Sequence, residues 1–152
     1  MAGIHDKGYI TFRTYVGIAG YFFNDDFTAT AATDDYSHLT ARRTIDKAYR
    51  IVYQTLVNYL LDEVPVNADG TLQISMLKSW ESTVENAISG SMTANGELSA
   101  DVNDPNDKGV KCFIDPNQNI VSSSKVIVNI AVRPFGYPRY IDVNLGFEAV
   151  AA

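Results

Sequence analysis

The side chains best suited to acid–base or metal chemistry are few. The chain has two histidines, His5 and His38, and one cysteine, Cys112. A catalytic triad needs a nucleophile, a base and an orienting group, and neither histidine neighbours the Gly-x-Ser-x-Gly pattern that presents a nucleophilic serine. A structural zinc site needs more Cys and His ligands than the chain contains. The residue types therefore predict no catalytic residue, no zinc site and no enzyme.

One acidic loop offers the oxygen ligands that a hard cation such as calcium prefers. Its side chains are those of Asp101, Asn103, Asp104, Asn106 and Asp107. The spacing differs from that of an EF-hand, and Pro105 interrupts it. The pairs Asp25-Asp26 and Asp34-Asp35 are typical of caps and turns, and no glycine pattern for nucleotide phosphates is present. We therefore expect polar turns at these positions, without a metal or a cofactor.

Positive charge gathers in one place, at Arg42, Arg43, Lys47 and Arg50, in a chain whose formal net charge is -6. This set is either a solvated helix face with i, i+4 pairing through Asp46 or a contact for an acidic partner. The acidic balance argues against a general nucleic-acid binder. No apolar run reaches the ~18 residues of a membrane span, and the first residues lack a signal-peptide pattern. The sequence thus predicts a protein that stays in the cytosol in which it is made.

The elements that position these residues begin with an alternating strand over residues 9–16, bounded by Gly8 and Gly17. Residues 20–33 are expected to form a packed loop, with room for a short strand within it. A long helix follows, capped by Asp34, Asp35 or Ser37 and ended by Pro65. Periodicity leaves two positions of its buried face open, one to Ala48 or Tyr49 and one to Tyr59 or Leu60.

A turn at residues 67–70 separates this helix from a second one over residues 75–89, which Gly90 is placed to cap. The buried face of the second helix is predicted to consist of Leu77, Trp80, Val84, Ala87 and Ile88. Three strands follow, over residues 110–114, 125–133 and 140–147. The fold class is therefore α+β, in one domain, with two main helices packed on a largely antiparallel or mixed sheet.

Three segments in this order resemble the carboxy-terminal domain of phage tail sheath proteins, especially the sheath-like family of Bacteroides-type prophages. They are the strand at Gly8–Thr14, the helix entry Asp34-Asp35-Tyr36 with Ala41–Ala48, and the closing strands joined through Pro134–Tyr137. The resemblance implies one sheath domain over residues 1–152, with a flexible segment at 1–8 and a strand or arm at 139–152. Because sheath subunits normally carry further domains, the chain is either a fragment or a reduced relative.

The resemblance further implies a virion structural protein that is assembled in the bacterial cytoplasm. It would polymerise with itself as a helical sheath around a tail tube protein, without binding nucleic acid or entering a membrane. An inter-subunit strand would present Tyr140, Ile141, Val143, Leu145 and Phe147 to a neighbour; alternatively, this strand completes its own sheet. The basic helix face would meet the tube. The alternatives are a non-contractile tail or baseplate adaptor that binds a single partner and, more remotely, a small hydrolase built on the acidic loop.

Overall fold

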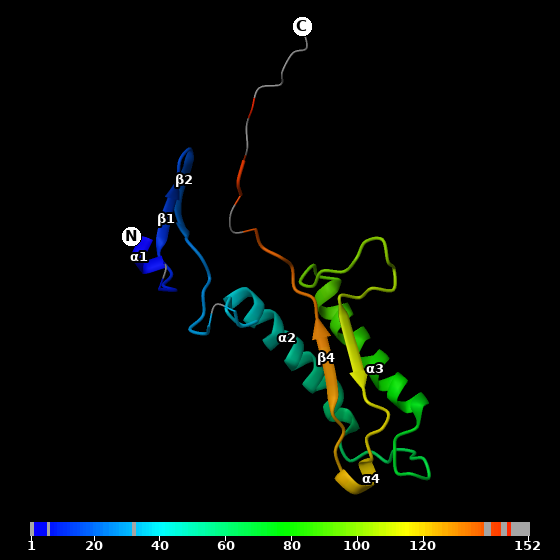
Figure 1. Cartoon of the computed structure of the whole chain (residues 1–152). Coiled ribbons are helices and arrows are strands. Elements are labelled where there is room, and N and C mark those ends of the chain that lie inside the picture. Colours follow the sequence, from blue (N-terminus) through cyan, green and yellow to red (C-terminus); the bar gives the residue numbers. More distant parts are fainter. Residues whose placement is uncertain (1, 6, 32, 139–140, 144–145, 147–152) are drawn as a thin grey trace.

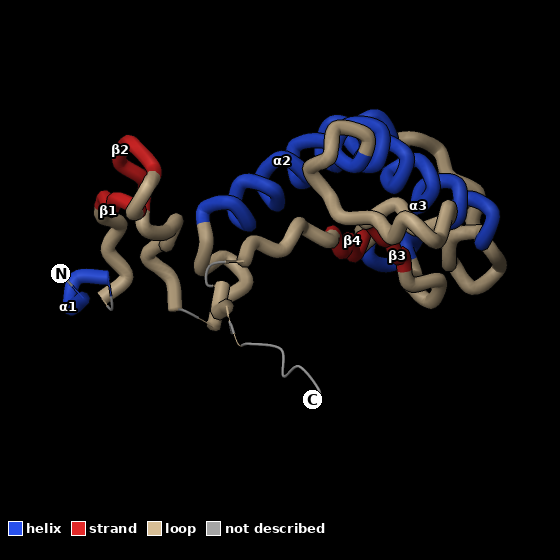
Figure 2. Tube along the Cα trace, turned by 90° about the horizontal axis from the view of Figure 1, so that it is seen from above, coloured by secondary structure: helices blue, strands red, loops and turns tan. Residues whose placement is uncertain are grey.

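The computed structural model describes residues 2–5, 7–31, 33–138, 141–143 and 146. The predicted α+β class is confirmed: two long helices pack on a two-stranded antiparallel sheet, and a second two-stranded hairpin stands apart from them (Figure 1). Seen from above, both helices lie on the same side of the sheet (Figure 2). None of the described helices combines the length and apolar character that a membrane crossing requires.

The regular elements follow in chain order. They are α1 (Ala2–His5), β1 (Phe12–Tyr15), β2 (Ile18–Phe23), α2 (Leu39–Leu56) with its 3-10 turn η1 (Val57–Tyr59), α3 (Ile74–Ile88) with its π-helical turn η2 (Ser89–Thr93), β3 (Val110–Ile114), α4 (Ile120–Ser123) and β4 (Val128–Val132). The hairpin pairs β1 with β2, and the sheet pairs β3 with β4 in the register Val110↔Val132 to Ile114↔Val128.

The core lies between the two helices and the sheet. The predicted inner face of α3 is buried at Leu77, Trp80, Val84 and Ile88 and half-buried at Ala87. On β4 the alternate residues Val128, Ile130 and Val132 pack against this core, while Asn129 and Ala131 face outward. The period-2 pattern of the sequence therefore identifies the inner face of the strand correctly.

The predicted helix ends need correction. The long helix stops at Leu56, well before Pro65, because a tighter turn follows and Leu61 then takes a left-handed backbone angle (φ 65°). It begins at Leu39, and neither Asp34, Asp35 nor Ser37 caps it; His38 occupies the N-cap position, and its side chain makes no capping hydrogen bond to the helix.

Gly90 is not the cap of the second helix, because α3 continues into the π-helical turn Ser89–Thr93. The chain leaves this turn at Gly96, whose φ of 69° is in the left-handed region that glycine tolerates best. The predicted turn at residues 67–70 is confirmed, with Gly70 N–H donating to the carbonyl of Asn67 (3.0 Å).

Two strand predictions also change. The short strand allowed for within residues 20–33 is present as part of β2, which begins earlier, at Ile18, and Gly17 (φ 82°) lies in the hairpin turn where Tyr15 faces Ile18. Of the predicted strand 140–147, residues 140, 144, 145 and 147 lie outside the described residues. Ile141–Val143 and Gly146 are described as exposed chain without helix or strand.

Candidate assembly surfaces

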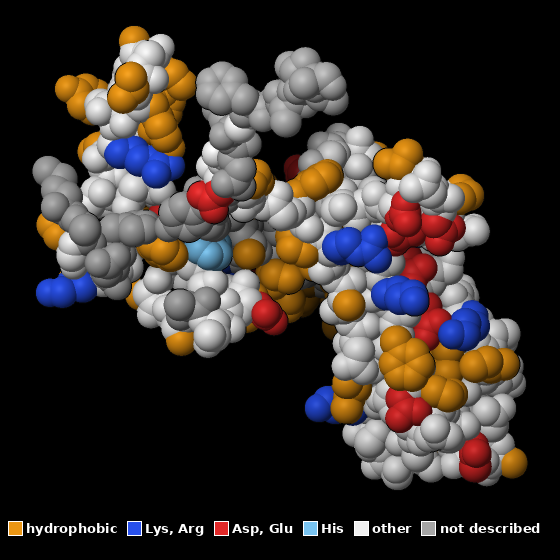
Figure 3. All heavy atoms as spheres, turned by 45° about the horizontal axis from the view of Figure 1, so that its top comes forward, with side chains coloured by type: hydrophobic (Ala, Val, Ile, Leu, Met, Phe, Trp, Pro, Cys, Tyr) orange, Lys and Arg blue, Asp and Glu red, His pale blue; other side chains and the backbone are white. Residues whose placement is uncertain are grey.

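The β1–β2 hairpin is an exposed apolar surface. Every residue of both strands is exposed, although most are aromatic or aliphatic. Tyr21 is 80% exposed and Val16, at the tip, 105% exposed. Figure 3 shows hydrophobic side chains gathered on this hairpin at the upper left. Monomeric soluble proteins rarely expose contiguous apolar patches of this kind unless the patch is an interaction site.

The hairpin is ordered by contacts within itself. The rings of Phe12 and Phe23 stack across the strands with centroids 4.9 Å apart, and Tyr15 meets Phe22 edge-on at 5.4 Å. The Arg13 guanidinium lies 4.5 Å from the Tyr15 ring centroid. An isolated two-stranded hairpin is marginally stable in water. A partner surface would therefore stabilise this one.

Asp26 connects the hairpin to the start of α2. Its carboxylate accepts hydrogen bonds from the backbone N–H (2.9 Å) and the hydroxyl (2.7 Å) of Thr40, in the first turn of the helix. It thus satisfies a helix amide that a capping residue would otherwise serve. Burial acts to raise the pKa of Asp26, but the bonds from Thr40 and the nearby His38 hold it below its usual value. This distant cap explains why the predicted local caps are not used.

His38 brings a second carboxylate into this junction. Its Nδ1 lies 3.1 Å from Asp26 Oδ1 and 3.7 Å from Asp25 Oδ1, and the Asp25 side chain is only 4% exposed. The three ligand atoms lie within 4.8 Å of one another, close enough to hold one divalent cation. Sequence reasoning missed that these residues meet, because nothing in their spacing signals a contact across twelve residues.

The predicted basic face of α2 divides into two parts. Arg42 pairs with Asp46 (3.2 Å), as expected for i, i+4, and Lys47 reaches Glu97 (2.6 Å) near the end of η2. Arg43 and Arg50 are exposed, and they form no ion pair with the described residues. The charge available to a partner is therefore smaller than the sequence suggests.

Tyrosines accompany these arginines on the outer face of α2. Tyr49 and Tyr53 are exposed, whereas Ala48 is buried against the core. Farther along, Tyr59 packs against Trp80 with ring centroids 5.1 Å apart, and Leu60 is exposed. Both alternatives left open by the periodicity are thus resolved, and the outer face presents aromatic as well as basic side chains.

The two edges of the β3–β4 sheet differ. On β3, the backbone N–H of Ile114 donates to Glu81 Oε1 and that of Cys112 to Glu85 Oε1, both at 2.9 Å. These amides point away from β4, so the outward groups of β4 belong to the residues directly opposite, Val128 and Ile130. No described strand pairs with that edge. The β3 edge is therefore closed by carboxylates from α3, and the β4 edge is open to a further strand.

An apolar groove of about 380 Å³ lies at the foot of α2. Its lining is largely hydrophobic: Leu56, Tyr59, Leu60, Leu61, Asp62, Val64, Trp80, Ile120, Ser124, Lys125, Val126 and Val128. Leu61 on its rim is 102% exposed and held at a positive φ, a conformation that costs a bulky residue backbone strain. The fold thus presents an apolar side chain to solvent at an energetic cost, beside an apolar hollow.

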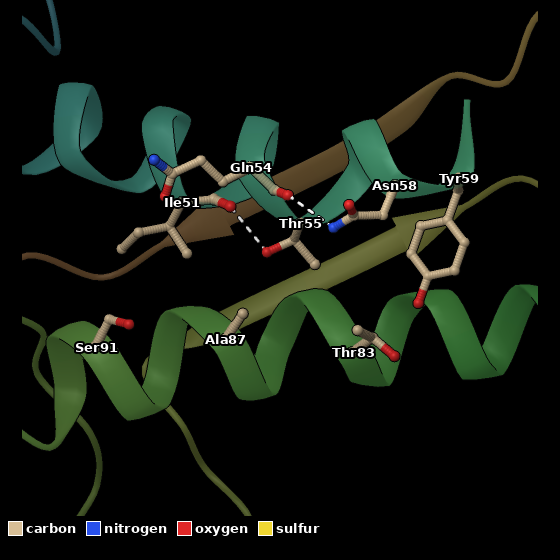
Figure 4. Close-up of a pocket in the computed structure, with 8 residues that line it drawn as sticks. All are labelled: Ile51, Gln54, Thr55, Asn58, Tyr59, Thr83, Ala87 and Ser91. Carbon is tan, nitrogen blue, oxygen red and sulfur yellow. Dashed lines mark hydrogen bonds between the residues drawn. The ribbon is translucent and has the colours of Figure 1, made fainter.

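A second hollow, of about 500 Å³, lies between α2 and α3 (Figure 4). Thr55 and Asn58 bond to carbonyls of their own helix, at 2.8 and 3.1 Å. Its lining residues include no histidine, cysteine, carboxylate, lysine or arginine. This hollow is therefore a poor candidate for catalysis.

The acidic loop forms polar turns, as predicted. Asp101 accepts the amide of Asn103, and Asp104 that of Asn106, each at 2.9 Å. Asp107 accepts the amides of Asp101 and Gly109 and pairs with Arg133, and these contacts lower the pKa of Asp107 to about 2. Its carboxylates thus organise the loop itself.

Cys112 lies on the inner side of β3. Burial, together with the carboxylates of Glu81 and Glu85, raises the pKa of the Cys112 thiol to about 11. The thiol therefore stays protonated at neutral pH, and it packs as a small apolar residue.

Residues 35–151 match the family described as "DUF2586, C-terminal domain". The chain belongs to this family. No curated protein matches the sequence. Among solved structures, a chain of the "Cryo-EM structure of the anti-feeding prophage (AFP) baseplate, 6-fold symmetrised" is similar, with a TM-score of 0.58 and 13% identity. The match covers 82% of this chain and 32% of that chain, so this chain spans about a third of its length.

The match to the DUF2586 C-terminal domain includes some of the surfaces described above and leaves out others. The matched residues contain α2, α3, the sheet and the apolar groove. The β1–β2 hairpin and the Asp25-Asp26 pair precede them. The likeness to the baseplate chain, at its low identity, concerns the fold alone.

Proposed function

We propose that this chain is a structural subunit of a phage tail or of a phage-derived injection machine, with no catalytic role. The observation that carries the proposal is the β1–β2 hairpin, whose aromatic side chains are exposed on both strands. Covering such a surface with another one lowers the free energy, because apolar side chains are then removed from water. The likeness of the fold to a chain of a prophage baseplate supports a particle of this kind as the setting.

More specifically, the chain would be a contractile-sheath subunit that polymerises around an inner tube by exchanging strands. The open β4 edge supports this proposal, because it offers unpaired backbone groups to an incoming strand. The donor would be the segment 140–147 of a neighbouring copy, with Tyr140, Ile141, Val143, Leu145 and Phe147 as its contacts. Ile141 and Val143 are exposed and therefore available. The carboxylates of Glu81 and Glu85, which reach from α3 to the β3 edge, would restrict strand addition to the β4 edge, and this fixes the direction of growth.

Two arginines of α2 would carry the proposed contact with the tube. Since Arg42 and Lys47 pair with Asp46 and Glu97, only Arg43 and Arg50 of the predicted set are left for an acidic tube surface. Their exposed neighbours Tyr49 and Tyr53 would add apolar contact area. This contact would depend on salt, because exposed charges are screened.

A baseplate adaptor that binds a single partner is the second candidate. It is favoured by one observation, the similarity of the fold to a chain of the anti-feeding prophage baseplate. The two candidates differ in assembly. Head-to-tail contacts that do not close give open helical filaments, whereas an adaptor would form a closed ring or stay monomeric.

Electron microscopy of the full-length gene product, co-expressed with the small tube-like protein expected beside it, tests the proposal. We expect striated tubes or stacked helical rings. Discrete rings would favour the adaptor. Monodisperse monomers at high concentration, with the tube protein present, would contradict an assembly role altogether.

A further inference from the structure

The β1–β2 hairpin and the end of α2 farthest from it lie at opposite ends of the molecule (Figure 1), and each carries an apolar feature. One is the tip of the β1–β2 hairpin, where Tyr15, Val16 and Ile18 are exposed. The other is the apolar groove at the foot of α2, rimmed by the exposed Leu60 and Leu61. The first is a protrusion and the second a hollow, and they cannot meet within one copy as it is folded.

We propose that the hairpin tip of one copy packs into this groove of a second copy. The inference rests on the proposed function insofar as it assumes self-assembly, and it names a contact separate from the exchanged strand. Tyr15, Val16 and Ile18 would lie against Tyr59, Trp80 and Val126, so that apolar surface is removed from water on both sides.

Charge is complementary across this contact. Residues 7–23 contain no acid, and Arg13, whose guanidinium lies over the Tyr15 ring, is the cation next to the tip. The segment beside the groove carries the exposed acids Asp62 and Glu63, with Lys125 as a cation among the lining residues. In a chain of net charge -6, this acid-free hairpin can approach a second copy with little repulsion.

The contact is a small one. Tyr15 and Ile18 face each other at the tip, whereas Phe12 and Phe23 pair at the other end of the hairpin, outside the groove. One aromatic and two aliphatic side chains bury less than the ~800 Å² per partner of a standard interface, so this contact would supplement the exchanged strand. Because donor and acceptor are different patches at opposite ends, each copy can bind the next without closing, which gives a polymer.

Disulfide trapping tests this contact. The Val16→Cys and Ser124→Cys chains are purified separately, mixed in equal amounts and oxidised, with Ser124 chosen because it is exposed and lines the groove. The native Cys112 is buried with a raised pKa, so it should not compete. We expect linked dimers only in the mixture, and a ladder of linked oligomers from a chain that carries both substitutions.

The matched control pairs Val16→Cys with Ser91→Cys, which is exposed at the far end of the helix pair from Tyr59 (Figure 4). Equal cross-linking of the control would overturn the proposal, as would dimers of Val16→Cys alone in place of mixed dimers. Filaments of the full-length product that form without the Val16–Ser124 link would overturn this contact and leave the proposed function standing. Folding of each variant is checked by circular dichroism.

Discussion

The β1–β2 hairpin and the helix–sheet body (α2, α3, β3 and β4) contain the same kinds of apolar residues, but the body buries them and the hairpin exposes them. In the body, apolar side chains such as Val84, Ile88 and Met92 are fully buried, and buried carboxylates have defined partners. In the hairpin, side chains of similar character are exposed, and they contact one another. The body thus gains its stability from its own core, and the hairpin would gain much of its stability from a partner.

The largest expected effect is on the body. Ile88→Ala should lower the free energy of unfolding by about 2–5 kcal/mol, because it leaves a cavity beside Met92 in a fully buried cluster. The matched change Phe23→Ala should cost less than about 1 kcal/mol, since that ring is exposed. Urea unfolding followed by Trp80 fluorescence measures both. Equal losses would mean that the hairpin is part of the same cooperative core.

The next effect concerns the closed sheet edge. Glu81→Ala should destabilise the body by about 1–3 kcal/mol, because the buried amide of Ile114 loses its acceptor. It should also promote aggregation through the exposed β3 edge, visible as concentration-dependent light scattering. Glu85→Ala, whose carboxylate is less buried, is the control and should cost less. A soluble Glu81→Ala variant of unchanged stability would show that this edge needs no protection.

Acidification should weaken the junction between the two regions. The pKa of Asp26 is lowered in the folded protein, so its contribution is complete above the unfolded value of 3.8 and is lost as the pH falls through the lower folded value. Asp26→Asn should therefore cost about 0.5–2 kcal/mol at pH 7 and flatten the pH dependence of the unfolding free energy below pH 4. Asp34→Asn, in an exposed turn, is the control. An unchanged slope would exclude Asp26 as the cap.

The smallest effect on stability is expected at the arginines of α2. Reversing Arg43 and Arg50 to glutamate should change the unfolding free energy by less than about 0.5 kcal/mol, because both are exposed and make no ion pair with the described residues. Binding to the tube protein should fall at least about tenfold at low salt, as measured by co-sedimentation. Lys47→Glu is the comparison, since it also breaks the contact with Glu97. Unchanged binding by the double variant would remove the tube-facing role.

The sequence predicts the buried faces of the helix–sheet body better than it predicts the ends of the helices and their long-range contacts. The inner faces of α3 and β4 follow from periodicity, because burial selects the same side at every turn or every second residue. The end of α2 does not, since Pro65 only sets a limit and the chain departs earlier through Leu61. The cap of α2 comes from Asp26, across a loop, and a contact of that range leaves no local pattern.

The candidate site was predictable only in part. Alternation identified β1 as a strand, but it also implied one buried face, and both faces are exposed. The basic cluster was visible, whereas its partial neutralisation by Glu97 depends on the tertiary fold. The open β4 edge could not be anticipated, because closing of the other edge depends on two carboxylates reaching from α3.

Backbone hydrogen exchange tests most directly the claim that the hairpin would be stabilised by a partner. In the isolated chain we expect the amides of α3 and β3 to be protected by the full unfolding free energy, and those of β1 and β2 to exchange orders of magnitude faster. In the assembled particle, the hairpin amides should become protected as well. Hairpin amides as protected as those of α3 in the isolated chain, and unchanged on assembly, would contradict the account.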